Sequence, residues 1–99
     1  MTNNFLGELR KQRERQTKQA LADVVRLSIF RQRIYQTSVS RRSGVSRSHL
    51  RAILRAEKCP TLFIFLELSR GLSTDPFELL RDVLDRRDEL RGQAQAGVQ

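Results

Sequence analysis

The segment from Gln36 to Leu54 combines polar side chains suited to hydrogen bonding with regularly spaced apolar ones. The apolar positions have the spacing of inward-facing residues in two short helices joined by a turn: Val39, Val45, Leu50 and Ile53. One face of the second helix would then stay free, and it carries Arg47, Ser48, His49, Arg51 and Arg55. Arginine can bond guanine O6 and N7 bidentately, serine and histidine are more permissive donors, and a helix N-terminus suits phosphate. The pattern indicates binding to the edges and backbone of a duplex nucleic acid.

Two small residues set the geometry of this segment. Gly44 can adopt the positive φ that ends a first helix over residues 36–42, and Val45 follows it as a buried turn residue. Ser46 can cap a second helix that runs to about Arg55. The two helices are therefore expected to cross steeply and to leave residues 46–55 accessible.

The helices that must hold this pair are indicated on both sides of it. Residues 20–34 carry apolar side chains on both flanks of one stripe, which suits a helix wedged between others. Asp75, Pro76 and Glu78 form a helix-start signal. The apolar face of that last helix would comprise Phe77, Leu80, Val83 or Leu84, and Leu90. We expect residues 20–91 to form one all-α domain.

Residues 61–72 allow two interpretations. The run Leu62-Phe-Ile-Phe-Leu66 is rich in β-forming residues, so a buried strand competes with a helix. The apolar positions nevertheless fit one helical face, and a lone strand would have no partner elsewhere in the chain. We favour a helix that Thr61 caps and whose inward face includes Leu62, Leu66 and Leu72.

The two ends of the chain differ from the centre. Residues 10–19 contain no hydrophobic side chain, so the basic extension at 1–19 is a solvated helix or a flexible arm, of which we favour the helix. Its charge fits an inert solvated surface, a second phosphate-contacting arm, or an arm that enters the minor groove. Residues 92–99 are small and polar, and we expect them to be disordered.

Composition restricts the class of protein. The 99 residues carry 19 basic and 11 acidic side chains, a net charge of +8. Residues 1–58 hold 14 of the basic and 4 of the acidic ones, so the positive charge is concentrated there and favours a polyanionic partner. A single cysteine, Cys59, and a single histidine make a disulfide, a Cys/His metal site or a Ser-His-Asp triad improbable. We therefore expect no cofactor, no catalysis, no membrane association and a reducing, cytoplasmic location.

The order of these features resembles the phage-repressor-like (Xre/Cro-type) helix-turn-helix regulators over residues 25–84. The likeness depends on Gln36, Ser40, residues 44–48, Ile53, residues 60–62, Leu66, Leu72 and residues 75–80. It implies a compact five-helix, lambda-repressor-like domain with the helix at 46–55 in the major groove. It further implies phosphate binding by Gln36, base contacts by Arg47 and Ser48, a methyl contact by Ala52, and backbone contact by Lys58. The DNA-binding set expected from the free face and the resemblance is Gln36, Thr37, Ser46, Arg47, Ser48, His49, Arg51, Ala52, Arg55 and Lys58.

Three positions depart from that family pattern. Arg33 stands where a glycine usually precedes the second helix, which puts the end of the first helix in question. Leu54 and Ala56 replace the glutamate and the glycine that usually close the recognition helix. The lost glutamate removes a polar contact, and Leu54 is free to join the core or an interface.

A homodimer would place two recognition helices about 34 Å apart, on successive turns of one groove. Two apolar faces are candidates for that contact, and they comprise Phe63 and Ile64, and Phe77, Leu80 and Leu84. The alternative is that both faces pack inside the monomer.

The function expected is sequence-specific binding to duplex DNA, with repression of transcription preferred to activation. A contact with RNA polymerase or another regulatory protein stays open through the acidic residues Asp82, Asp85, Asp88 and Glu89. The main rival is a protein-interaction module, an antitoxin or an antiactivator, on the same fold. An RNA-binding protein would be expected to expose stacking aromatics, and a nuclease would need a cluster of carboxylates in the basic half.

Overall fold

The computed structural model describes residues 2–96, with side chains from residue 4 to residue 94. Five helices follow one another: α1 (Thr2–Gln32), α2 (Gln36–Ser43), α3 (Arg47–Leu54), α4 (Leu62–Gly71) and α5 (Pro76–Ala96). The expected all-α, five-helix fold is confirmed, and residues 62–66 are helical. Within residues 2–96, no helix has both the length and the apolar character that crossing a membrane requires.

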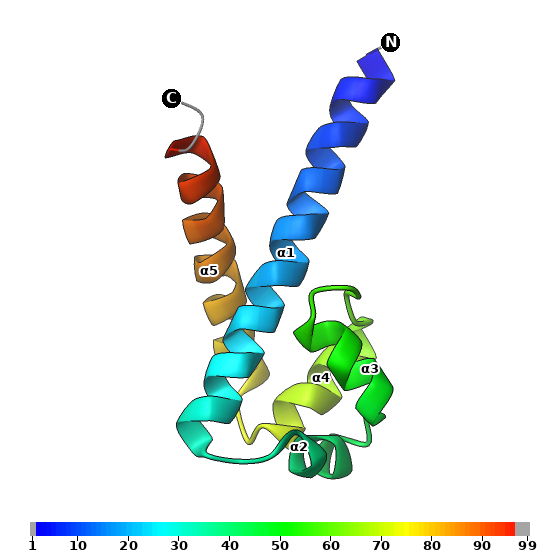
Figure 1. Cartoon of the computed structure of the whole chain (residues 1–99), viewed down its shortest axis with the longest axis vertical. Helices are drawn as coiled ribbons and strands as arrows, with labels where there is room; N and C mark the ends of the chain where they lie inside the picture. Colours follow the sequence, from blue (N-terminus) through cyan, green and yellow to red (C-terminus); the bar gives the residue numbers. More distant parts are fainter. Residues whose placement is uncertain (1, 97–99) are drawn as a thin grey trace.

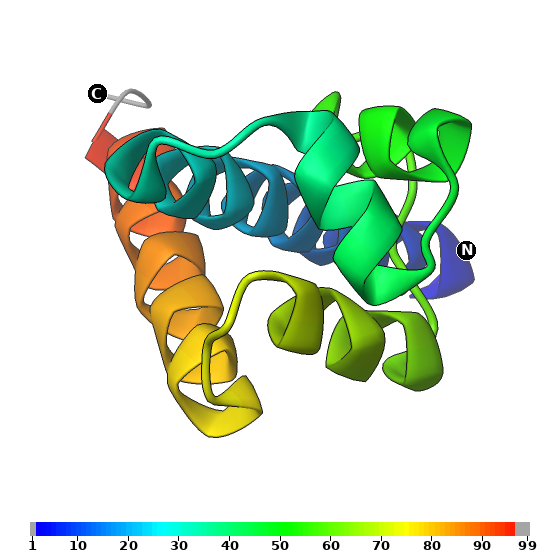
Figure 2. The same ribbon diagram turned by 90° about the horizontal axis from the view of Figure 1, so that it is seen from below.

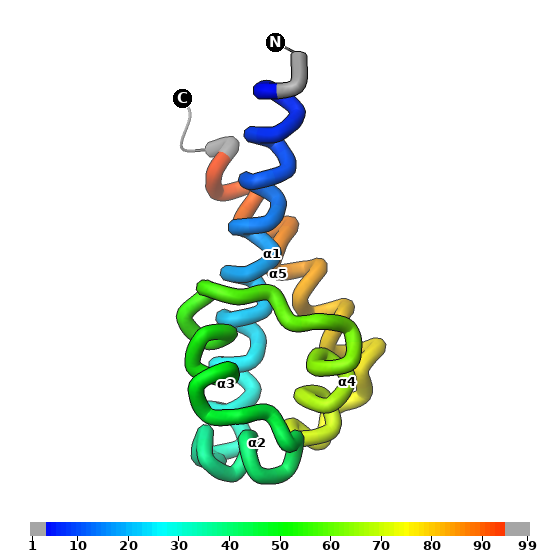
Figure 3. Tube along the Cα trace, turned by 90° about the vertical axis from the view of Figure 1, so that its right-hand side faces the viewer, coloured from blue at the N-terminus to red at the C-terminus, as the bar shows by residue number. Residues whose placement is uncertain are grey.

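The long helix α1 organises the molecule. It contacts α5 along one side and α3 on another, while α4 contacts both α2 and α5 (Figure 1). Seen from below, α2 and α3 lie on the side of the bundle away from α5 (Figure 2). The N-terminal half of α1 extends past α2, α3 and α4, and this makes the molecule 46 Å long but only 25 × 22 Å across (Figure 3). The basic extension at residues 1–19 is therefore continuous with the first helix of the domain over its described residues.

The core lies where the five helices meet. Its most buried side chains come from every helix and from the turn after α2: Ala20, Leu21, Val25, Val39, Val45, Leu50, Ile53, Leu54, Leu68, Leu72, Leu79 and Val83. The four residues of the segment 36–54 that were expected to point inward are all among them: Val39, Val45, Leu50 and Ile53. Leu54 also joins the core, where the departure from the family pattern had left its role open.

The expected inward face of α4 is partly wrong. Leu62 is 74% exposed and Leu66 is also exposed, whereas Leu68 is fully buried beside Leu72. The cause is the contact with α2, where a Cβ on Gly71 would come within 2.7 Å of the Ser43 Cβ. This close approach turns α4 so that the stripe through Leu68 faces the core.

The expected face of α5 is also partly wrong. Phe77 is 81% exposed and Leu80 is exposed as well. Val83 is buried as expected, and it is accompanied by Leu79, which was not expected to point inward. Apolar residues cover two neighbouring stripes of α5, and only the one through Leu79 is covered by α1 and α4. The tail prediction is wrong for residues 92–96, because α5 continues to Ala96, while residues 97–99 lie outside the described part of the chain.

Arg33 ends α1 although it is not a glycine. Its φ is +55°, in the left-handed region, and its N–H donates to the Phe30 carbonyl at 3.1 Å. The next N–H, of Ile34, reaches back to the Ile29 carbonyl at 3.3 Å. These two bonds are those of a Schellman motif, which closes the helix at a conformational cost that glycine would avoid.

Candidate nucleic-acid interface

The turn between α2 and α3 is fixed by side chains of α2. Gly44 has φ +75° and donates to the Ser40 carbonyl at 2.9 Å, as its conformational freedom allows. The buried Ser43 hydroxyl donates to the Val39 carbonyl at 2.7 Å and accepts from the N–H of Val45 at 3.2 Å. The Ser40 hydroxyl donates to the Val45 carbonyl. Because these bonds satisfy the turn backbone internally, the crossing of α2 and α3 is rigidly defined.

Helix α3 is held at both ends and along its inner face. The Ser46 hydroxyl caps its N-terminus by accepting from the N–H of His49 at 3.2 Å. Leu50 and Ile53 are fully buried on its inner face. At its C-terminus, Arg26 of α1 donates from Nε to the Leu54 carbonyl at 2.8 Å. This bond ties α3 to α1 at the position where the family pattern has a glutamate.

Most of the residues expected to bind DNA are solvent-exposed, and they come from α2, from α3 with its N-cap and from the loop after α3. Those that are solvent-exposed are Gln36, Thr37, Ser46, Arg47, Ser48, Arg51, Arg55 and Lys58. His49 and Ala52 are half-buried, so their contact with a ligand would involve only part of each side chain.

Two shallow hollows show that the start of α2 and the start of α3 adjoin. One is lined by Gln36, Thr37, Arg47 and Arg51, and the other by Thr37, Ser40 and Arg47 together with Arg41. The structure therefore places the expected phosphate-binding residues of α2 directly beside the expected base-contacting residues of α3. Both helix N-termini contribute backbone N–H groups to this surface.

Arg41 was missed by the sequence analysis. It is exposed and shares a hollow with Thr37 and Arg47, so it adds a cation to the edge of the surface. The signal that could have found it is its spacing of one helical turn from Thr37. Tyr35, which is also exposed, lines a groove with Arg33 and Gln36 at the other edge.

No basic side chain of residues 36–58 has an acidic partner among the described residues. Among the described residues, all ion pairs involve bases of α1, α4 and α5. In α1, for example, a hydrogen bond from Lys18 lowers the pKa of Glu14. The positive charge of α2 and α3 is thus uncompensated within this part of the chain and is available to an external anion.

The comparison with protein families identifies the domain that carries this surface. A helix-turn-helix family model matches residues 31–79, which span α2, α3, α4 and the turns between them. These residues form a helix-turn-helix domain of the Xre/Cro type. The searches of curated proteins and of solved structures found no match.

The helix-turn-helix arrangement explains why expected DNA-binding residues of α2 and α3 lie beside one another on one surface. In this family of DNA-binding transcription regulators the second helix of the motif is the one that enters the major groove. Here that helix is α3, and an α-helix with its side chains is about 10–12 Å in diameter, which fits a major groove about 12 Å wide. The long N-terminal half of α1 and the C-terminal part of α5 lie outside the matched residues.

Proposed function

We propose that this protein is a sequence-specific, non-catalytic repressor that binds duplex DNA as a homodimer. Helix α3 would lie in the major groove, with Arg47 and Ser48 at base edges and the Ala52 methyl near a thymine. Gln36 and Thr37 would contact phosphates on one side, and Arg55 and Lys58 on the other. Repression needs only that the bound protein occlude a promoter, so no further domain is required. The proposed setting is the cytoplasm of a bacterial or phage-infected cell.

The observation that carries this proposal is the combination of a rigid α3 with an unpaired basic face. The cap at Ser46 and the buried Leu50 and Ile53 fix the backbone of α3. Arg47 and Arg51 have no acidic partner within the described residues. A fixed backbone with free donors suits recognition of base edges, because binding then has to order only the side chains and not the helix.

A homodimer is supported by the apolar side chains that α4 and α5 leave accessible. Phe63, Phe77, Leu80 and Leu84 are exposed, whereas Ile64 is half-buried against the core and offers less to a partner. Burying these residues in a two-fold contact would remove apolar area from water and pair two copies of α3.

The proposal is tested by selecting bound duplexes from a genomic library and titrating salt against the best one. Log affinity should fall by about 0.9 per neutralised phosphate for each decade of salt. Replacing Arg47 by Ala should cost about 1–3 kcal/mol on the selected site and relax the preference at one base pair. If Arg47→Ala weakens all sequences equally, Arg47 is not a base reader. If no duplex competes with bulk DNA, the function is that of a protein-interaction module.

A further inference from the structure

The N-terminal half of α1 is long, and its described side chains from Asn4 to Arg15 are exposed. Among the described residues of this half, none between Arg10 and Gln19 is apolar, yet Phe5 is 68% exposed and Leu6 and Leu9 are also accessible. A helix that stands alone in water is marginal, and its stability in proteins usually comes from packing of an apolar face. The apolar tip of α1 therefore lacks the packing partner that its length requires.

The other end of α1 has a matching set of exposed apolar residues. Leu27 and Phe30 are 45% and 79% exposed. Leu9 and Leu27 are 18 residues apart, which is five helical turns, and Phe5 and Phe30 are 25 residues apart, which is about seven turns. All four side chains thus lie along one face of α1, two at each end.

This spacing is self-complementary when two copies of α1 run antiparallel. If Leu9 of one copy lies opposite Leu27 of the other, a two-fold axis passes near Lys18 and Phe5 falls within one residue of Phe30. The same register brings Arg13 near Asp23, and it places the two copies of Gln16 about 6 Å apart along the helix axis, where their amides can bond one another. We propose that a second copy of this chain pairs antiparallel along α1, so that the tip of each helix covers the base of its partner.

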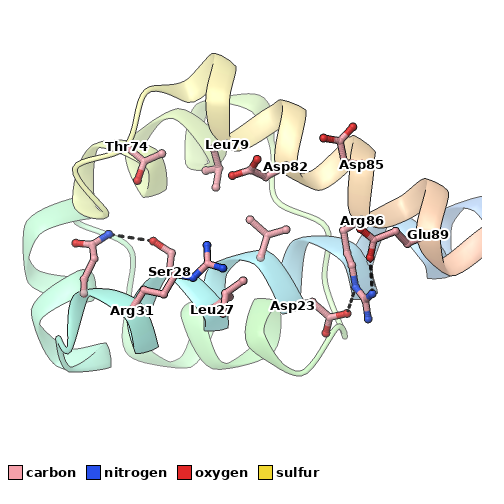
Figure 4. A pocket seen from close by; sticks show the side chains of 12 residues that line it. Asp23, Leu27, Ser28, Arg31, Thr74, Leu79, Asp82, Asp85, Arg86 and Glu89 are labelled. Atoms are coloured by element: carbon pink, nitrogen blue, oxygen red, sulfur yellow. Dashed lines mark hydrogen bonds and ion pairs between the residues drawn. The ribbon is translucent and has the colours of Figure 1, made fainter.

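Charge supports a copy of the same chain as the occupant. Leu27 lies in a groove of about 700 Å³ between α1 and α5, where Leu79 and Asp82 extend from α5 toward α1 (Figure 4). Asp85 adds a further carboxylate to this groove, whereas those of Asp23 and Glu89 are bonded to Arg86. In the proposed register the basic tip of the partner's α1, with its Arg10 and Arg13, reaches this acidic rim. Neither of these arginines has an acidic partner within the described residues.

The apolar area is of the right order for a dimer contact. A standard interface buries about 800 Å² on each partner. A phenylalanine buries about 150–250 Å² when fully covered, so Phe5 and Phe30 would supply about a third of this. The leucines and the paired helix surface over about 38 Å supply the rest. This inference rests on the proposed function only in that the paired chains are taken to bind DNA together. The pairing along α1 itself does not require DNA.

Cysteine cross-linking tests the register directly. Cys59 is exposed, so the variants carry Cys59→Ser. Chains with Leu9→Cys and chains with Leu27→Cys are oxidised separately and as a mixture, without DNA. Antiparallel pairing predicts a disulfide dimer in the mixture at a yield at least about fivefold above either chain alone, because like positions lie about 27 Å apart and a disulfide spans at most about 7 Å between Cα atoms. Equal yields in the three samples, or no cross-link in the mixture, overturn the proposal.

Two matched controls separate pairing from random collision. Leu62 is 74% exposed, close to the 68% of Phe5, so a Leu62→Cys chain mixed with the Leu27→Cys chain should cross-link no more than the single chains. Adding Phe5→Ser to the Leu9→Cys chain should lower the yield, whereas adding Leu62→Ser should not. A Leu62→Cys yield as high as that of Leu9→Cys, or no effect of Phe5→Ser, also overturns the α1 pairing. Any of these failures leaves DNA binding by α3 intact, and loss of DNA binding leaves the cross-link intact.

Discussion

The arginines of α2 and α3 differ from those of α5 in what they bond. Arg86 of α5 donates to Asp23 at 2.9 Å and to Glu89 at 2.9 Å, and these bonds, the one to Asp23 foremost, raise its pKa. Arg87 reaches Thr17 of α1. Arg47 and Arg51 of α3 have no such partner among the described residues. The same residue type thus joins helices in one region and is left available for a ligand in the other.

The largest effect is expected where α3 meets the core. Leu50 and Arg51 are neighbours in sequence but lie on opposite faces of α3, one fully buried and one exposed. Replacing Leu50 by Ala should lower the free energy of unfolding by about 2–5 kcal/mol, because it leaves a cavity in the core. Urea denaturation followed by circular dichroism measures this loss. A loss under about 1 kcal/mol would mean that α3 is not anchored by Leu50.

A smaller pair of effects should separate the two classes of arginine. Arg51→Ala should weaken binding to the selected duplex and reduce the magnitude of its salt slope by about 0.9, with the free energy of unfolding changed by less than about 0.5 kcal/mol. Arg86→Ala should instead cost about 0.5–1 kcal/mol of stability through the lost link to α1, at unchanged DNA affinity. Fluorescence anisotropy and thermal melting, applied to both variants, measure the difference. If the two variants behave alike, the contrast between the regions is not functional.

The smallest effect is expected at the end of α3. Ala56 has φ +59° and its neighbour Glu57 donates to the Ala52 carbonyl at 2.9 Å, so it occupies the left-handed position of a Schellman motif. Ala56→Gly should raise stability by about 0.5–1 kcal/mol, because the relief of strain exceeds the entropy that glycine adds to the unfolded chain. Thermal melting measures this gain. A lower melting temperature would show that Ala56 is not strained.

The central segment was predictable from sequence because its signals are local. The turn at Gly44, the cap at Ser46 and the inward positions of α3 depend on residues within a few positions of one another. The faces of α4 and α5 were less predictable, since both helices carry apolar residues over more than one stripe. The close contact between Gly71 and Ser43 selects the face of α4, and these residues lie far apart in sequence.

The sequence by itself determined the number of helices, the helix-turn-helix and the excess of basic residues in the first 58 positions. Periodicity, capping and charge are properties of short stretches, so they survive without knowledge of the fold. Only the tertiary structure decided that the basic residues of α2 and α3 lack acidic partners among the described residues while Arg86 of α5 has one, because the packing of α1 against α5 joins Asp23 to Arg86 across the bundle. It also decided that α1 is one continuous helix over Thr2–Gln32, and that the apolar side chains near its two ends stay accessible on one face.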